Sequence, residues 1–315
     1  MLRIPRVSRA PKLDDFLTGI PREAEACITD FRQYEPGDAV PASQETSAFL
    51  SYDDKNLYVV FVCMDQPGKV RARMAKREDI ESDDKVAVNL DTFHDHQHCY
   101  SFRVNPLGVQ LDGIFTEGQG SDDSYDMLWH SEGRLYDKGY VVWIAIPFKS
   151  LRFPRTEVQG WGIALGRSIR RNNEMSCWPY LTQRIESYLQ QFANMEGLER
   201  ISPGRNMQLI PYWVSSRTRF LNPAAADGPA FQTDMEVRPG LDAKFVLRDA
   251  LTFDVALNPD FSQVESDEPQ VMINQRFEVF FPEKRPFFIE NAGFFRPPLN
   301  CFFRAALWTP NLALA

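Results

Sequence analysis

The chain has 315 residues, of which 43% are hydrophobic and 25% are charged, a composition typical of folded rather than disordered proteins. This length allows one large domain or two ordinary ones. The formal net charge of -8 excludes a protein-wide basic field of the kind that holds nucleic acid. No apolar run approaches the roughly 20 residues that a membrane-spanning helix needs.

The five cysteines predict neither a disulfide framework nor a structural zinc site, because their number is odd, their spacing is wide and no C-x-x-C motif occurs. We expect scattered buried thiols instead. The N-terminal segment has basic residues but lacks the apolar stretch of a secretory signal. From this segment we expect either a cytoplasmic protein or a sequence whose true start is missing.

The region up to about residue 45 contains several breaking prolines and is predicted to be mostly loop, with a short helix around Arg22–Ile28. Thr46–Tyr52 and Leu57–Met64 then flank a polar turn, which predicts a β-hairpin. The second of these strands and Tyr140–Phe148 are apolar on both faces, as strands inside a sandwich are. Between them, Lys69–Lys85 has a basic half and an acidic half, so we expect a solvated segment with local ion pairs. A phosphate or nucleic-acid patch is the alternative.

Short strands at regular spacing, separated by Gly, Asn and Asp turns, predict an antiparallel β-sandwich. The sequence lacks H-E-x-x-H, G-x-S-x-G, a phosphate-binding P-loop and the dinucleotide G-x-G-x-x-G. We therefore assign no catalytic residue. The further strands are predicted at Val86–Asp91, Cys99–Asn105, Val109–Ile114, Met127–Glu132 and Trp161–Arg170.

The polar faces of three consecutive strands predict a binding surface. Successive strands usually pair, so their alternating polar side chains should line up on one face of the sheet. Planar amide, carboxylate and guanidinium groups are suited to hydrogen-bonding sugar hydroxyls. An ordinary wet outer face explains the same pattern. The predicted sugar-binding residues are Asn89, Asp91, Arg103, Asn105, Gln110 and Asp112, with Trp129 and Trp178, or Tyr180, as rings that stack on the sugar.

Two loops carry possible metal ligands, although we expect no cofactor. A turn with three histidines and a carboxylate could hold a transition metal, and an acidic, glycine-containing loop could hold calcium. For both loops, a solvated polar loop is the simpler interpretation. The histidine turn comprises His94, Asp95, His96 and His98, and the calcium candidates are Glu117, Asp122, Asp123 and Asp126.

After Ser202–Asn206, which is interpreted as a linker turn, polar and apolar residues alternate. Strands are predicted at Met207–Phe220, Val237–Leu247 and Ala250–Leu257, with one wet and one apolar face. The remaining sequence is rich in Phe and Pro.

Longer motifs carry a resemblance to a known family. PKLDD, TDFRQYEPGDAVPASQET, YDDKNLYVVFVCMD, DDKVAVNLDTFHD, YSFRVNPLGVQLDG, WIAIPFKSLRFP and WGIALGRSIRRNNE resemble the carbohydrate-binding family 9-like domain, in the version found in the DUF5916 group. LNPDFSQVESD and RFEVFFPEKRPFFIENAGFF resemble the start of the outer-membrane β-barrel domain of that group. The resemblance implies an all-β chain: a jelly-roll-like sandwich over residues 10–200, then the first strands of an incomplete barrel domain over residues 205–315.

The resemblance also implies binding of a polysaccharide or oligosaccharide, associated with carbohydrate catabolism, in the periplasm or outer membrane of a Gram-negative-type bacterium. A glycoside hydrolase acting on O-glycosyl bonds and an outer-membrane transport or assembly component without sugar specificity remain alternatives. The chain departs from the family in three ways. It has no Trp in LDDFLTGIPREAEA, no signal peptide, and only the first few barrel strands. We therefore expect a truncated protein.

Overall fold

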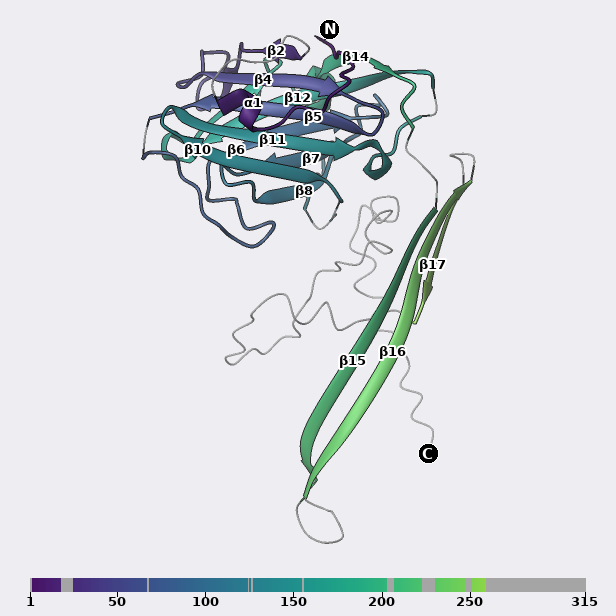
Figure 1. Cartoon of the computed structure of the whole chain (residues 1–315). Helices are drawn as coiled ribbons and strands as arrows, with labels where there is room; N and C mark the ends of the chain where they lie inside the picture. The colour runs from purple at the N-terminus through teal and green to yellow at the C-terminus, as the bar shows by residue number, and fades with distance from the viewer. Residues whose placement is uncertain are drawn as a thin grey trace. The chain divides into compact units, whose positions relative to one another are not determined.

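The computed structural model describes residues 2–17, 25–66, 68–123, 125, 127–154, 156–202, 207–222, 230–247 and 251–258. The chain divides into two compact units, Met1–Arg205 and Asn206–Ala315, and each is described by itself (Figure 1). The predicted all-β class is confirmed, since strands account for most of the described secondary structure. Among the described residues, no helix is long and apolar enough to cross a membrane.

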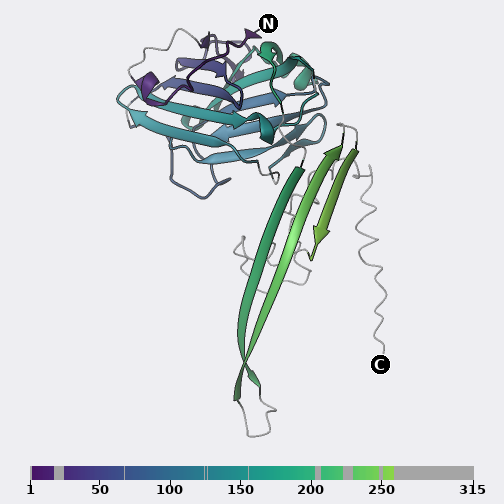
Figure 2. The same cartoon turned by 45° about the vertical axis from the view of Figure 1, so that its right-hand side comes forward.

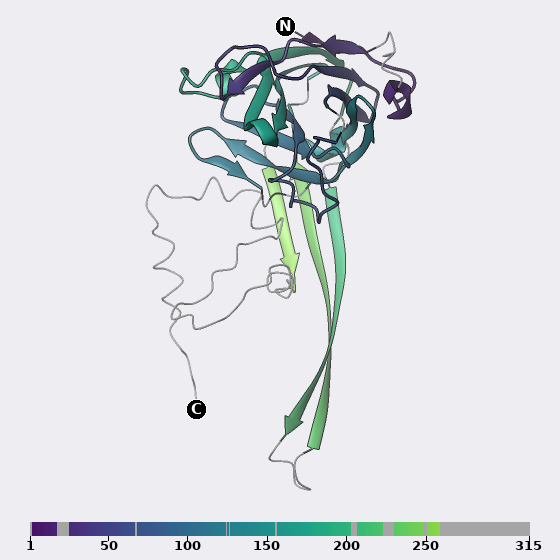
Figure 3. The same cartoon turned by 90° about the vertical axis from the view of Figure 1, so that its left-hand side faces the viewer.

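The first unit is a sandwich of two sheets (Figure 3). The first sheet has the order β1-β14-β12-β6-β7-β8-β9, with β13 pairing with β12 and β3 with β13. Its strands are β1 (Leu2–Arg3), β3 (Arg32–Glu35), β6 (Lys85–Asp91), β7 (His98–Val104), β8 (Gln110–Thr116), β9 (Gly120–Asp122), β12 (Val158–Ile169), β13 (Glu174–Trp178) and β14 (Ala193–Glu199).

The second sheet has the order β10-β11-β5-β4-β2, and all its pairings are antiparallel. The predicted hairpin is confirmed in β4 and β5. The strands are β2 (Ala26–Ile28), β4 (Thr46–Tyr52), β5 (Asn56–Met64), β10 (His130–Tyr136) and β11 (Gly139–Pro147). The helical turns of the unit are α1 (Asp14–Leu17), η1 (Phe148–Ser150), η2 (Arg170–Asn172) and η3 (Leu189–Gln191).

Apolar side chains fill the space between the sheets and also cover their outer faces. Phe61 of β5 and Phe102 of β7 belong to the central core. On the other face of the second sheet, Val60 and Val62 pack with Phe16 of α1. The prediction that the β5 strand is buried on both faces is therefore confirmed.

Two connecting segments cover the outer face of the first sheet: the one that contains Ile80 and precedes β6, and the one that contains η3. Leu189 of η3 packs with Cys99 and Cys177 there, and Ile80 packs with Leu111 of β8. These buried thiols agree with the expectation for the cysteines, whereas Cys27 is exposed. Because two covering segments lie over it, this outer face is not an open sheet surface.

Two predicted elements differ from the structure. The helix around Arg22–Ile28 is wrong for Ala26–Ile28, which form β2 and pair with β4. The strand predicted at Met127–Glu132 begins only at His130, in β10, because Met127 and Trp129 pack into the core ahead of it.

The second unit contains an antiparallel ribbon of three strands, β15 (Met207–Asn222), β16 (Ala230–Leu247) and β17 (Leu251–Leu257) (Figure 2). Tyr212 packs over Gly240 of the paired strand, where a Cβ would have no room. The three predicted strands are confirmed. The Phe- and Pro-rich sequence that carries RFEVFFPEKRPFFIENAGFF lies outside the described residues.

Cross-strand partners share a face, so the ribbon has one mainly apolar face, which also carries Arg217 and Arg219, and one mainly polar face, which also carries Ile210 and Phe220. Trp213 pairs with Pro239, and Leu221 pairs with Phe231. The described members of the apolar face include Leu209, Trp213, Leu221, Phe231, Met235, Val237, Phe253, Val255 and Leu257, all more than a third exposed. The opposite face carries Asp234, Glu236 and Arg238.

Candidate functional site

The register of three strands decides which of the predicted sugar-binding residues share a face. Asn89 pairs with Ser101, and Arg103 pairs with Ala87, so Asn89 and Arg103 both lie on the outer face of the first sheet. Asp112, however, pairs with Phe102, and Gln110 pairs with Val104. These two side chains therefore point to the inner face, and the expectation of one common polar surface is wrong for them.

Asp112 and Gln110 hold the chain that leads into β10. Asp112 is buried, and it accepts hydrogen bonds from Arg77 Nη2 at 2.6 Å and from the Met127 amide at 2.6 Å. Burial raises the pKa of Asp112, although Arg77 acts against this shift. Gln110 donates to the Trp129 carbonyl at 3.2 Å. These are contacts within the fold.

Trp129 belongs to the core. Its side chain is 3% exposed, and its ring lies edge-on to Phe102 with a centroid distance of 5.1 Å. A ring buried in this way offers no face to a sugar, so its predicted position at the edge of the surface is wrong. Trp178 is half-buried against the core. Tyr180 is 43% exposed, and its hydroxyl donates to Asp38 at 2.6 Å.

Asn105 is buried and fully engaged on the outer face. Its amide nitrogen donates to the Arg73 carbonyl and to Asp83, at 2.8 and 3.0 Å. Its amide oxygen accepts from the backbone of Leu107 and Val109. Because each polar atom of Asn105 already has a protein partner, this residue organises the turn after β7.

Asp91 is also buried, beneath the histidine turn. Its Oδ2 accepts the His96 amide at 3.0 Å, and the His96 ring lies 3.2 Å from the Leu189 carbonyl through Nδ1. His94 and His96 meet edge to face with centroids 5.0 Å apart. His98 lies near Asp95, at 3.5 Å between Nδ1 and Oδ2. The turn thus joins β6 to the segment that covers the sheet.

The acidic loop is likewise tied to the protein. Glu117 accepts the backbone N–H groups of Tyr188 and Leu189, at 3.2 and 2.9 Å, and so caps η3. Asp123 accepts from Arg103. Asp122 lies in β9, and Asp126 is outside the described residues. Within the described ranges, no group of three His, Cys, Asp or Glu side chains is placed to hold a metal.

Of the predicted residues on the outer face, Arg103 keeps a partly exposed side chain, whereas the neighbouring Asn89 is buried, and both adjoin a group of charges. We call Glu81, Lys85, Arg103, Asp123 and Arg170 the Arg103 cluster. Its three cations come from three neighbouring strands: Lys85 begins β6, Arg103 lies in β7, and Arg170 follows β12. Asn89 lies beside them, with its amide nitrogen 3.4 Å from the Tyr188 hydroxyl.

Glu81 joins the three cations of the cluster. Its carboxylate lies 2.5 Å from Lys85 Nζ, 3.4 Å from Arg103 Nη1 and 2.9 Å from Arg170 Nη2. The pKa of Glu81 is lowered, because these three cations together outweigh the effect of burial. Burial lowers the pKa of Lys85, and repulsion from Arg170 and Arg103 acts in the same direction.

Sequence reasoning proposed Arg103 but missed Glu81, Lys85 and Arg170. The signal for Glu81 and Lys85 was the mixed-charge segment Lys69–Lys85, for which local ion pairing was predicted, and that pairing is confirmed. Arg73, for example, lies 3.0 Å from Asp83. The cluster could not be foreseen because this segment folds back over the outer face, which strand alternation alone does not show.

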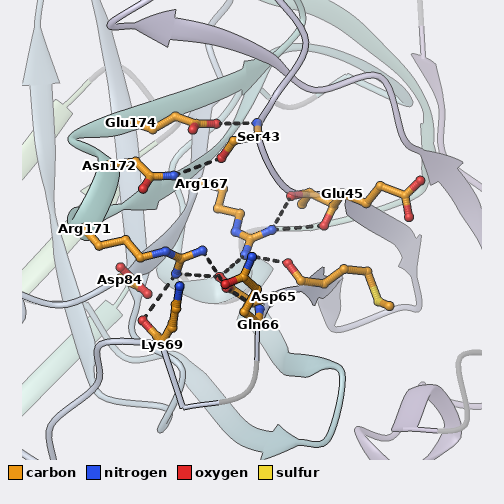
Figure 4. A network of polar contacts seen from close by, with 12 residues as sticks. Ser43, Glu45, Asp65, Gln66, Lys69, Asp84, Arg167, Arg171, Asn172 and Glu174 are labelled. Carbon is orange, nitrogen blue, oxygen red and sulfur yellow. Dashed lines mark hydrogen bonds and ion pairs between the residues drawn. The ribbon is translucent and has the colours of Figure 1, made fainter.

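A second polar network lies buried in the sandwich (Figure 4). Arg167 of β12 is 1% exposed and contacts the buried Asp65 at 2.9 Å, and Asp65 also accepts from Arg171 at 2.7 Å. Arg167 further donates to the carbonyls of Glu45 and Met64, at 3.0 and 2.9 Å. The network links the first sheet to the second and offers no accessible site. Its sequence signal was a charged residue at an inward-facing position of β12.

The model of a domain of unknown function, DUF5916, matches residues 203–303. The DUF5916 resemblance is confirmed. No curated protein matches the chain.

Solved structures similar to the chain include a candidate carbohydrate-binding protein from Bacteroides uniformis, with 11% identity and a TM-score of 0.47, covering 62% of this chain and 96% of the other. A family 9 carbohydrate-binding module from Caldicellulosiruptor kristjanssonii, in complex with cellotriose, has 14% identity and a TM-score of 0.40, over 62% and 92% of the two chains. The same kind of module with glucose has 14% identity and a TM-score of 0.41, over 62% and 94%.

Proposed function

We propose that the sandwich unit binds carbohydrate, as a polysaccharide or oligosaccharide, at the outer face formed by Asn89 and the Arg103 cluster. The observation that carries this proposal is the placement of a guanidinium and two carboxylates on one partly accessible face, beside the buried amide of Asn89. The DUF5916 resemblance extends the proposal to carbohydrate catabolism in a cell-envelope protein.

The chemistry of this face suits sugar hydroxyls, which both donate and accept hydrogen bonds. The guanidinium of Arg103 is a planar donor with five N–H groups, and the carboxylates of Glu81 and Asp123 are acceptors. Glu81 is 59% exposed and Asp123 is 39% exposed, so both can meet a ligand from solvent.

Isothermal titration against a panel of oligosaccharides tests this proposal. We expect at least one sugar to bind, and Arg103→Ala to weaken its binding about tenfold or more, since hydrogen bonds to charged groups contribute about 1.5–3 kcal/mol. Arg134→Ala is the matched control, because Arg134 is an exposed arginine in an ion pair on the other sheet. If no sugar in the panel binds, or if Arg103→Ala binds sugar as tightly as the wild type, the proposal is contradicted.

A second proposal concerns the ribbon of the other unit: its apolar face contacts lipid, which agrees with a location at the outer membrane. The exposed Trp213, Phe231 and Met235 support it, because a soluble surface rarely carries so many large apolar side chains on one face. We expect the purified protein to float with phospholipid vesicles in a density gradient. A protein that stays at the bottom of the gradient contradicts this proposal.

A further inference from the structure

We infer that the Arg103 cluster selects an acidic sugar, a hexuronate unit whose carboxylate takes the place that Glu81 now occupies. The inference rests on the proposed carbohydrate binding and names its substrate class. It starts from an asymmetry within the cluster, in which the cations are fixed by the fold while their carboxylate partner stands at the surface.

The exposures of the side chains show this asymmetry. Lys85 is 10% exposed, Arg103 is 14% exposed and Arg170 is 35% exposed, whereas Glu81 is 59% exposed. Lys85 and Arg103 lie in paired strands and Arg170 directly follows β12, but Glu81 belongs to the covering segment that precedes β6. An incoming carboxylate can therefore replace that of Glu81 without any change in the sheet.

The cluster also has donors that Glu81 leaves unused. The Nε atoms of Arg103 and of Arg170 are buried and have no hydrogen-bond partner among the described residues. A buried donor without a partner is costly, and a guanidinium pairs best with a carboxylate that it holds by two parallel hydrogen bonds. A ligand carboxylate that reaches these nitrogens would gain hydrogen bonds that Glu81 does not make.

The neighbours of the cluster favour a sugar over a simple anion. Arg103 Nη2 lies 3.4 Å from the Ser121 hydroxyl, and Asn89 lies on the same face. A hexuronate presents one carboxylate together with ring hydroxyls, and it thus matches a cationic centre flanked by the Ser121 hydroxyl and the exposed Asp123 carboxylate, which can accept from ring hydroxyls. The three cations lie close together around one carboxylate, and their mutual repulsion also favours an anionic ligand.

The experiment compares trigalacturonate with its methyl ester by isothermal titration, because esterification removes the charge of the carboxyl groups and keeps the ring hydroxyls. We expect the acid to bind about tenfold more tightly, as one charge-assisted hydrogen-bond pair would provide. This preference should shrink at high salt. Arg170→Gln should weaken binding of the acid by a larger factor than binding of the ester, so that the ratio of the two affinities falls.

Glu81→Gln gives the sharper test, because removal of a competing carboxylate should raise the affinity for trigalacturonate several-fold. Glu132→Gln is the matched control, since Glu132 is a similarly exposed carboxylate paired with Arg134 on the other sheet. If Glu81 only supports the structure of the site, Glu81→Gln should lower the affinity for trigalacturonate instead. If Glu81→Gln fails to fold, the comparison of acid with ester in the wild type and in Arg170→Gln still decides.

The outcomes separate this inference from the proposed function. Equal binding of acid and ester, or weaker binding in folded Glu81→Gln, overturns the inference and leaves carbohydrate binding standing. Inorganic phosphate that competes as well as trigalacturonate also overturns it, because the cluster would then be a general anion site. If neither these sugars nor any neutral sugar binds, the proposed function itself fails.

Discussion

Arg167 and Asp65 form an ion pair that is almost completely buried, with 2.9 Å between Nη2 and Oδ2 (Figure 4). Arg167 lies in the first sheet, whereas Asp65 follows β5 of the second. The guanidinium also lies over the Tyr140 ring, 5.3 Å from its centroid. A buried charge is tolerated only when it is paired and hydrogen-bonded, so this pair adds a polar link between the two sheets to the apolar core that they share.

Arg167→Met should therefore lower the free energy of unfolding by about 3–5 kcal/mol, because it leaves Asp65 buried with only Arg171 as a charged partner. Urea denaturation at neutral pH measures the change. The control is Arg134→Met, which breaks an exposed pair and should cost less than about 1 kcal/mol. The double variant Arg167→Met with Asp65→Leu should recover much of the loss, and equal losses in the single and double variants would contradict this account.

Asp83 should make the stability depend on pH in the acid range. Burial acts to raise its pKa, but the hydrogen bonds from Asn105 and Arg73 and the charge of Arg73 outweigh it, so the pKa of Asp83 is lowered. The stabilisation by the ionised form is therefore complete above the usual aspartate pKa. It is lost as the pH falls through the lower value of the folded state.

Asp83→Asn should accordingly lower the free energy of unfolding by about 2–3 kcal/mol at pH 7, and the gap to the wild type should close below about pH 4. Urea denaturation at pH 7, 5 and 3 follows this gap. Asp79→Asn changes an exposed carboxylate beside the same Arg73 and should shift stability by less than about 0.5 kcal/mol. A gap that stays constant down to pH 3 would show that charge is not what Asp83 contributes.

Asp112→Asn tests whether the inner face of the first sheet contributes to stability only or also to sugar binding. Loss of the charge-assisted contact with Arg77 should lower the free energy of unfolding by about 1–3 kcal/mol. Its sugar affinity should change less than about twofold, because Asp112 points away from Arg103. Thermal unfolding and calorimetric titration on the same sample test both statements. A variant of full stability that no longer binds sugar would place the ligand on the other face.

The elements that could be predicted are those specified by local pattern. Thr46–Tyr52 and the strand that follows it show apolar residues around a polar turn, and the ribbon strands alternate over many residues. In these segments the side-chain period and the turn chemistry point to the same structure, so sequence alone is sufficient. The cationic Arg103 was also found because it interrupts an apolar strand at an outward position.

The register of β8 could not be predicted, because a shift of one residue in a strand turns every side chain to the other face. The turn after Asn105 sets this register through hydrogen bonds from Leu107 and Val109 to the Asn105 side chain. Leu111 can then lie outside because Ile80 covers it. That contact is distant in sequence, and it is the reason Asp112 points inward.

The apolar face of the ribbon leads to a final prediction about lipid. Val237 lies on that face and is 46% exposed, whereas Val214 lies on the opposite face, beside Arg238. A carboxylate placed among lipid chains is strongly disfavoured, so Val237→Asp should reduce flotation with phosphatidylcholine vesicles about tenfold. Val214→Asp makes the same substitution on the polar face and should leave flotation nearly unchanged. Equal loss in the two variants would mean that the alternation of the strands does not direct the apolar face to lipid.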